Sequence, residues 1–351
     1  MATIRKRENG KFISYETQIR KLGYPAQTRT FKTREAAEKW ARMVETEMDR
    51  GIFVSRAESE RTTLAEALDR YLTEVTPSKK GAIREKDRIN RWKNRPLAKC
   101  ALAAIRGADL AKFRDDMRKA GKAENTIRLE LALISSLYET ARREWGMEAL
   151  ANPVKMIKAP GGSNKRDRRL FVGEEEYLWK GLHEAAPGNI YIVPCCQFAV
   201  ETGMRQGEIL GLEWHEIDTK RCVAHLSDTK NSDPRDVPLS SRAVAIIAAL
   251  PRPIEGGRIF PVSQDYLIRV FSRGLSKARS HYEEAFNVTD KHPDPKMLTG
   301  MKFHDLRHEA ASRLASLLSA TELAKMMGWR TIQMAMRYYH PRAEEMAKKL
   351  G

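Results

Sequence analysis

The stretch "ENTIRLELALISSLYETARREWG", residues 124–146, decides the fold class. Its apolar and aromatic residues recur at steps of three and four, which places their side chains on one face of an α-helix. This face consists of Ile127, Leu131, Ile134, Tyr138, Ala141 and Trp145. The pattern predicts a long helix whose apolar face packs into a core, and it favours a mainly helical chain.

The sequence before this helix predicts more helices with one basic side. Thr63 and Glu66 have the spacing of a capping box and precede an apolar run at helical spacing. We expect four helices between residues 63 and 147. The polar positions of this region include many cations, namely Lys79, Lys80, Arg84, Lys86, Arg88, Arg91, Lys93 and Arg95.

The N-terminal residues predict a small β-sheet followed by a helix. The stretch "TIRKRENGKFISYETQIRK" (3–21) alternates charged and apolar residues around Asn9-Gly10, which is a hairpin signal. Residues 27–33 favour a third strand, and Thr33 is placed to cap a helix over residues 34–49. The strands carry many Lys and Arg side chains, so their exposed face fits a DNA groove. A solvated sheet face is the alternative interpretation.

Two polar stretches, residues 49–62 and residues 158–169 ("KAPGGSNKRDRR"), predict domain boundaries. In the segment that follows them, strand-like runs flank a turn at 231–234, so we expect a β-hairpin over 221–240 among helices. The predicted domains are a β-sheet domain at 1–55, a helical domain at 62–157 and a mostly helical domain at 169–351. The fold class is therefore mainly α, in a multidomain α+β chain.

Composition narrows the class of partner. The formal net charge is +17, and a basic chain of this kind favours a polyanion, with nucleic acid first. A merely soluble surface and an anionic membrane surface are the alternatives. The sequence contains no run of about 20 apolar residues, the length that a membrane span needs. The stretch "MATIRKRENG" (1–10) lacks the apolar core of a signal peptide. The 4 cysteines show no C-x-x-C spacing, so reduced thiols in a cytosol are expected.

Several short stretches of the last predicted domain carry polar side chains suited to chemistry. "ETGMRQGEILGLEW" (201–214) places Arg205 at a predicted helix start, with Glu208 one turn on and able to hold its guanidinium. Lys230 lies at the tip of the predicted hairpin. The remaining candidates come from "FHDLRHEAASRL" (303–314) and "MMGWRTIQMAMRYYHP" (326–341), and they are His304, Arg307, His308, Trp329, Tyr338 and Tyr339.

Each of these residues also has an ordinary interpretation. Arg205 is suited to a plain ion pair, Lys230 to a solvated turn, and the tyrosines to half-buried packing. His304 and His308 have the i, i+4 spacing of zinc ligands, but no Glu stands in H-E-x-x-H order and no third ligand is evident.

Taken together, the stretches resemble the tyrosine recombinases, the phage-integrase family. The motifs are T-G-x-R-x-x-E-I, T-K-N before a strand ending V-P-L, H-D-L-R-H, G-W and R-Y-x-H, in the family's order over most of residues 63–345. The basic sheet ahead of them looks like the family's arm-site DNA-binding domain. The chain is also similar to shufflon-type DNA invertases, which as a group lack such a sheet and carry a longer C-terminal tail, so an integrase-type enzyme is expected.

The resemblance implies a site-specific recombinase that cuts and rejoins DNA through a 3′-phosphotyrosyl intermediate, without metal, cofactor or ATP. It gives Tyr338 the role of nucleophile, because this residue stands nine positions after Trp329 and directly before x-His. The other catalytic roles go to Arg205 and Arg307 on the phosphate, Lys230 as general acid, His304 as acceptor of the tyrosine proton or donor to the phosphate, and Trp329 in place of a more usual His. Glu208 and His308 are assigned supporting roles.

The resemblance also implies partners and a location. They are double-stranded DNA with core and arm-type sites, a homotetramer on DNA, accessory DNA-bending or directionality proteins, and the bacterial cytoplasm near the nucleoid. No membrane partner is implied. A type IB topoisomerase-like enzyme and a DNA-binding regulator without activity are the rival functions. The polar segment 280–301 is expected to be a loop over the DNA or a contact for a partner.

Overall fold

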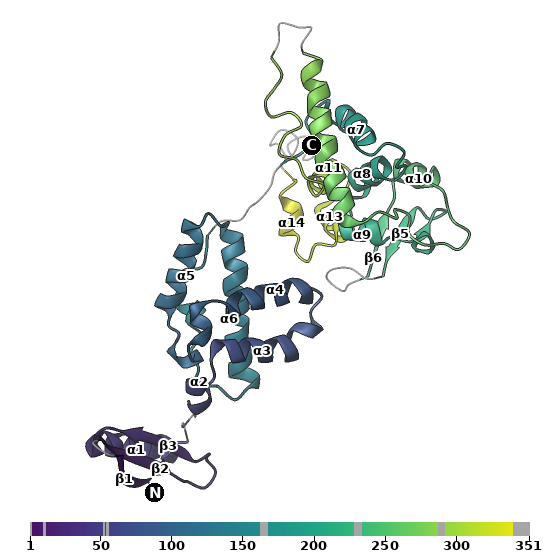
Figure 1. Cartoon of the computed structure of the whole chain (residues 1–351). Coiled ribbons are helices and arrows are strands. Elements are labelled where there is room, and N and C mark those ends of the chain that lie inside the picture. Colours follow the sequence, from purple (N-terminus) through teal and green to yellow (C-terminus); the bar gives the residue numbers. More distant parts are fainter. Residues whose placement is uncertain are drawn as a thin grey trace, which may run out of the picture. The chain divides into compact units, whose positions relative to one another are not determined.

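The computed structural model describes residues 2–9, 12–51, 53, 56–161, 168–227, 234–286 and 292–339. The chain divides into two compact units, Met1–Asn164 and Lys165–Gly351 (Figure 1). Each unit has its own hydrophobic core. None of the helices in the described ranges is long and apolar enough to cross a lipid bilayer.

The first unit begins with the predicted β-sheet and helix. An antiparallel sheet in the order β1-β2-β3 is followed by helix α1, whose N-terminus is capped by the Thr33 hydroxyl as expected. The elements are β1 (Ala2–Asn9), β2 (Phe12–Ile19), β3 (Gln27–Phe31) and α1 (Arg34–Asp49). The apolar face of α1 packs against Ile19 of the sheet. Gly10 at the predicted hairpin turn lies outside the described residues.

The rest of the first unit is helical. Residues 63–147 contain four α-helices, which confirms the prediction, and both hydrogen bonds of the capping box between Thr63 and Glu66 are formed. The α-helices are α2 (Ala57–Arg61), α3 (Leu64–Glu74), α4 (Ala82–Lys93), α5 (Gly107–Lys119) and α6 (Glu124–Glu144). The 3-10 turns are Thr76–Ser78, Pro96–Lys99, Leu102–Ala104 and Pro153–Met156.

Helix α2 differs from the prediction, because it lies in the stretch that reads as a linker. Its end is fastened to the helical core by backbone hydrogen bonds from Leu102 to Thr62 and from Leu64 to Cys100, both 2.9 Å. This pairing joins segments that are distant in the sequence, so no local sequence pattern predicts it. The predicted apolar face of α6 is buried as expected, and the Tyr138 hydroxyl donates to the Leu102 carbonyl at 2.9 Å.

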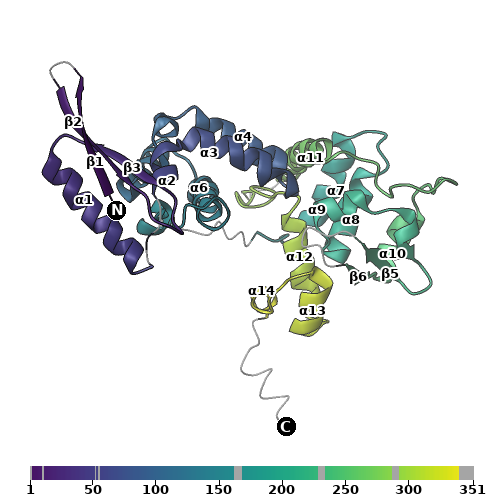
Figure 2. The ribbon, with the colours of Figure 1, turned by 90° about the horizontal axis from the view of Figure 1, so that it is seen from below.

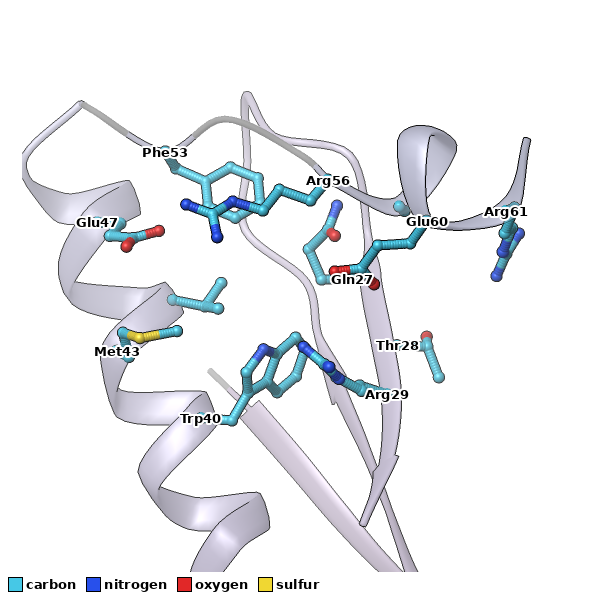
Figure 3. A pocket seen from close by; sticks show the side chains of 12 residues that line it. Gln27, Thr28, Arg29, Trp40, Met43, Glu47, Phe53, Arg56, Glu60 and Arg61 are labelled. Carbon is cyan, nitrogen blue, oxygen red and sulfur yellow. The ribbon is translucent and has the colours of Figure 1, made fainter. Parts of the chain in front are cut away.

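A hollow of about 350 Å³ lies beside α1 in the first unit (Figure 3). Trp40 and Phe53 form aromatic walls, and Arg29, Arg56 and Glu60 place charges at its rim. Every residue that lines it comes from positions 27–61.

The second unit consists of helices and a small antiparallel sheet in the order β4-β5-β6, which lies at one edge of the unit (Figure 1). Its α-helices are α7 (Glu174–Ala185), α8 (Ile192–Thr202), α9 (Gln206–Gly211), α10 (Ser241–Ala248), α11 (Gln264–Glu284), α12 (Asp305–Leu314), α13 (Ala320–Met327) and α14 (Gln333–Met336). A 3-10 turn covers Trp214–Glu216, and the strands are β4 (Ile217–Asp218), β5 (Val223–Leu226) and β6 (Arg235–Pro238). Figure 2 shows α12, α13 and α14 next to one another.

The predicted hairpin is confirmed by the pairing of β5 with β6, from Val223↔Pro238 to Leu226↔Arg235. Strand β4 was not expected, since its two residues are too few to show an alternating pattern. Of the predicted turn at 231–234, residues 231–233 lie outside the described residues.

The polar segment 280–301 is only partly a loop. Helix α11 continues through residue 284, and Met297, Leu298 and Met301 are buried in the core of the second unit. The Arg279 side chain donates to the Met297 carbonyl at 2.8 Å and ties this return to α11. The apolar side chains of the return are thus part of the core rather than of an exposed surface.

The contact between α7 and α11 yields a stability prediction. A Cβ on Gly181 of α7 would lie 2.6 Å from the Ala278 backbone nitrogen of α11, too close for unstrained packing. We expect Gly181→Ala to lower the free energy of unfolding by about 1–3 kcal/mol. In Gly211→Ala, the matched control in helix α9, the new methyl meets nothing within 4 Å, so stability should stay equal or rise slightly. Urea denaturation followed by circular dichroism measures both, and equal stability of the two variants would contradict the packing.

Candidate active site

The first motif builds the turn that presents Arg205. Helix α8 is capped at its C-terminus by Gly203, whose φ of +62° favours glycine. A Cβ added at this position would lie 2.6 Å from the Met327 sulfur. Arg205 is the N-cap of α9, and its backbone N–H donates to the Glu208 carboxylate at 2.8 Å. Its Nη1 donates to the same carboxylate at 2.7 Å. The predicted pairing of Arg205 with Glu208 is therefore present.

Arg307 is a deeply buried cation, with 6% of its surface exposed. It lies on α12, and its guanidinium donates to the Gly203 carbonyl and, at 2.6 Å, to the Met327 carbonyl. Burial, and after it the neighbouring charge of Arg205, lowers the pKa of Arg307 to about 9. The guanidinium stays charged at neutral pH, so it is a fixed positive group with little water around it.

A third arginine, Arg235 at the start of β6, joins this cluster. Its Nη1 and Nη2 donate to the two oxygens of Glu208 at 3.1 and 2.7 Å, and its Nε donates to the Met326 carbonyl at 3.1 Å. Sequence reasoning missed this residue as a site member, although it ends the motif "TKNSDPR" (229–235) just before V-P-L. A basic residue at the foot of the hairpin was the available signal.

Glu208 is the carboxylate that pairs with this cluster. Burial would raise its pKa, but hydrogen bonds from Arg235 and from the backbone and side chain of Arg205 outweigh burial, so the pKa is lowered overall. One carboxylate thus faces the charges of Arg205, Arg235 and Arg307, and the site keeps a positive surplus.

The three guanidiniums meet the C-terminus of α13. The carbonyls of Met326, Met327 and Gly328 accept from Arg235, Arg307 and Arg205, respectively, and the last of these bonds is 3.0 Å. The final carbonyls of a helix have no partner within the helix and carry partial negative charge, so cations are favoured there. The arrangement fixes the chain at the point where Trp329 follows.

Trp329 stacks on Tyr338. The two rings are parallel within 3° with centroids 5.6 Å apart, and the Arg307 guanidinium lies 5.7 Å from the Trp329 ring centroid. The Tyr338 hydroxyl lies 2.5 Å from Nδ1 of His308. His308 was predicted to have a supporting role, and this contact places it directly at the candidate nucleophile.

His304 lies one helical turn before His308, and the two rings meet edge to face with centroids 5.4 Å apart. Part of the His304 surface is exposed, but partial desolvation lowers its pKa, with further lowering from His308 and Arg307, while Asp305 opposes them. This shift favours the neutral form of His304. The structure brings together five predicted catalytic residues, which are Arg205, His304, Arg307, Trp329 and Tyr338, whereas Lys230 lies outside the described residues.

The neighbouring Tyr339 has a different partner. Its hydroxyl donates to the Leu318 carbonyl at 2.6 Å, and burial raises its pKa, as does the charge of Glu322. The two adjacent phenols therefore make different contacts. Tyr338 lies at the charged cluster, and Tyr339 bonds to Leu318 in the connection between α12 and α13. In the parts of the chain that the structure describes, no group of three or more His, Cys, Asp or Glu side chains is placed to hold a metal ion.

Comparison with known proteins identifies the family. Residues 173–345 match the model of the phage integrase family. A shufflon-specific DNA recombinase of Escherichia coli is 39% identical over 299 residues, which are 83% of this chain and 72% of that protein. A putative integrase/recombinase of Haemophilus influenzae is 30% identical over 362 residues, 99% of this chain and 89% of that protein. The chain belongs to the phage integrase family.

As a family member it is a tyrosine recombinase, an enzyme of site-specific recombination. The fold agrees with this membership. A lambda integrase dimer bound to a COC′ core site has a TM-score of 0.62 at 20% identity and covers 97% of this chain and 95% of its own. The Tn1549 transposon integrase in complex with circular intermediate DNA has a TM-score of 0.63 at 16% identity, covering 83% and 99%. The expected fold class, mainly helical with small antiparallel sheets, is confirmed.

The buried carboxylate of Glu208 gives a pH-dependent prediction. In Glu208→Gln the guanidiniums lose their counter-charge, so we expect the free energy of unfolding at pH 7 to fall by about 3 kcal/mol. Because the folded-state pKa is below the ordinary 4.5, the wild-type advantage is complete above pH 4.5. It is lost as the pH falls through the lower folded value.

The measurement is thermal or urea unfolding of wild type and variant at pH 7 and at steps below pH 4.5. Glu283→Gln is the matched control, because Glu283 forms a surface ion pair with Arg279 and is 49% exposed. That control should change stability by less than about 1 kcal/mol. A Glu208→Gln deficit that is the same at every pH would contradict the assigned role.

Proposed function

We propose that this recombinase cuts and rejoins duplex DNA through a 3′-phosphotyrosyl intermediate on Tyr338. The observation that carries the proposal is the Tyr338 hydroxyl, which lies 2.5 Å from the His308 ring in the same cluster as Arg307. A phenol with an imidazole at hydrogen-bond distance is the arrangement of an activated nucleophile. Fixed guanidiniums supply the charge that a phosphoryl-transfer transition state requires.

The reaction exchanges one phosphodiester for another. Tyr338 Oη attacks phosphorus, the DNA 5′-oxygen leaves, and that 5′-hydroxyl later attacks the phosphotyrosine of a partner strand. Bond energy is conserved at each step, so no ATP is required. Arg205 and Arg307 bind the non-bridging oxygens with paired donors and make a metal ion unnecessary, and Lys230 protonates the leaving 5′-oxygen as general acid.

DNA binding is proposed for the basic side of the helical domain at 62–157 and for the β-sheet domain at 1–55. On α4, Arg88 and Arg91 lie 3.5 and 3.0 Å from one carboxylate oxygen of Glu130, which is 3% exposed. The buried carboxylate holds the exposed Arg91 beside the partly buried Arg88, which orders Arg91 for a phosphate contact. Binding should weaken steeply with salt, because released counterions drive it.

A homotetramer on DNA is part of the proposal. A lambda integrase tetramer bound to a Holliday junction has a TM-score of 0.62 to this chain and covers 94% of it. Two duplexes cut at two positions each require four nucleophiles, and one chain offers one such tyrosine in this site. Accessory DNA-bending or directionality proteins complete the proposed assembly.

Inversion is the second candidate for the outcome of recombination. The shufflon-specific recombinase, at 39% identity, favours it, while the 30% identical putative integrase/recombinase that aligns over 99% of the chain favours integration. The orientation of the target sites separates the two. Plasmids with paired sites in direct or inverted repeat, scored by restriction mapping, give excision or inversion products. Efficient relaxation of a site-free plasmid with no recombinants would instead indicate a topoisomerase.

The target sequence can be obtained by covalent capture. We expect wild-type protein, incubated with a library of nicked duplexes of random sequence, to retain a subset of DNA through denaturing washes. The nick lets the short cleaved strand diffuse away, so the phosphotyrosyl product accumulates. Sequencing the retained DNA should return one related set of sites, and no retained DNA would contradict the proposed function.

The two adjacent tyrosines give a sharp test on the captured duplex. Tyr338→Phe should abolish covalent attachment, because it removes the attacking oxygen. Tyr339→Phe is the matched control and should retain attachment, because its hydroxyl binds the Leu318 carbonyl instead. Denaturing gel electrophoresis with labelled duplex measures both, and the reverse pattern would overturn the assignment of the nucleophile.

A further inference from the structure

We propose that His308, and not His304, takes the proton from Tyr338 when its oxygen attacks the scissile phosphate. This inference rests on the proposed function, since it assigns a residue to the phosphotyrosyl reaction. The family resemblance leaves two roles open for His304, acceptor of the tyrosine proton or donor to the phosphate, and gives His308 only a supporting role.

The geometry singles out one nitrogen. The distance from His308 Nδ1 to Tyr338 Oη is 2.5 Å, and the two rings are inclined by 29° with centroids 6.2 Å apart. This is a short distance for a hydrogen bond between a neutral phenol and an imidazole. For the phenol to donate, Nδ1 must carry the lone pair, so the ring hydrogen of the neutral histidine is on Nε2.

Two contacts fix the rings in this relation. His304 meets the edge of the His308 ring, and the indole of Trp329 stacks on the phenol of Tyr338 with an angle of 3° between the ring planes. Both aromatic partners of the hydrogen bond are thus held by a second ring. A base and a nucleophile whose positions are fixed before substrate arrives need little reorganisation during reaction.

His304 then takes the other role that the resemblance offers it, a hydrogen bond to the phosphate. It stands at the N-cap of α12, one turn before His308, and Arg307 of the same helix faces the phosphate-binding cluster. Burial and the neighbouring cations lower the pKa of His304. A neutral imidazole still supplies one N–H donor.

The bond from Tyr338 Oη to phosphorus forms while the bond from phosphorus to the 5′-oxygen breaks, and the phenol proton moves to His308 Nδ1. The 5′-oxygen takes a proton from Lys230. In rejoining, the 5′-hydroxyl returns its proton to Lys230, and His308 returns its proton to the phenolate that leaves phosphorus.

The test is single-turnover cleavage of the nicked duplex returned by covalent capture, with wild type, His308→Ala and His308→Asn. Asn places a hydrogen-bonding atom near the position of Nδ1 but takes up no proton. If His308 accepts the proton, both variants should be slowed by about 10²–10⁴-fold. Cleavage by His308→Asn within a few-fold of the wild-type rate would show that the side chain only orients Tyr338, and would overturn the inference.

A modified substrate separates the two proton transfers. In a duplex whose scissile 5′-bridging oxygen is replaced by sulfur, the leaving group departs without a proton. This substitution should restore Lys230→Ala and leave His308→Ala slow. Restoration of His308→Ala by the sulfur substrate would place His308 on the leaving-group side and overturn the inference. His183→Asn, at an exposed histidine of α7, is the matched control and should cleave both duplexes at the wild-type rate.

A measurement on the unsubstituted protein keeps the inference testable if the variants fail to fold. In ¹⁵N-histidine NMR spectra of wild type, neutral His308 should be the Nε2–H tautomer, and an Nδ1–H tautomer would overturn the assignment. A wild-type protein that forms no covalent product with any duplex would overturn the proposed function and this inference together. Wild-type cleavage with a fast His308→Asn variant would overturn this inference alone.

Discussion

Three guanidinium groups bound to three successive carbonyls at the C-terminus of α13 hold the candidate active site together. Arg235, Arg307 and Arg205 donate to the carbonyls of Met326, Met327 and Gly328. These contacts join the hairpin strand β6, helix α12 and the start of α9 at a single point. The position of strand β6 and the position of the segment that carries Trp329 and Tyr338 both depend on this junction.

The junction carries more positive than negative charge. Glu208 supplies one negative charge to a cluster of three arginines, and repulsion from Arg205 contributes to the lowered pKa of Arg307. A scissile phosphate would supply the missing charge and relieve that repulsion. In the proposed reaction, guanidiniums held in place by these carbonyls would supply preorganised stabilisation of the phosphoryl-transfer transition state.

Local spacing in the sequence was sufficient for part of this arrangement. The pairing of Arg205 with Glu208 spans three residues, within reach of helical periodicity, and the α6 core face and the β5-β6 hairpin are equally local. Arg235 was missed because its partners Glu208 and Met326 lie 27 and 91 positions away. The contact of His308 with Tyr338 spans 30 positions, so only the fold could show which histidine faces the nucleophile.

In the proposed reaction, the oxygen of Tyr338 becomes bonded to DNA. The most direct measurement is mass spectrometry of the trapped protein–DNA complex after digestion with protease and nuclease. The account predicts a nucleotide phosphate on the peptide that contains residues 338 and 339, with fragment ions that place it on Tyr338. A phosphate on Tyr339, on another residue or on no peptide at all would contradict the account.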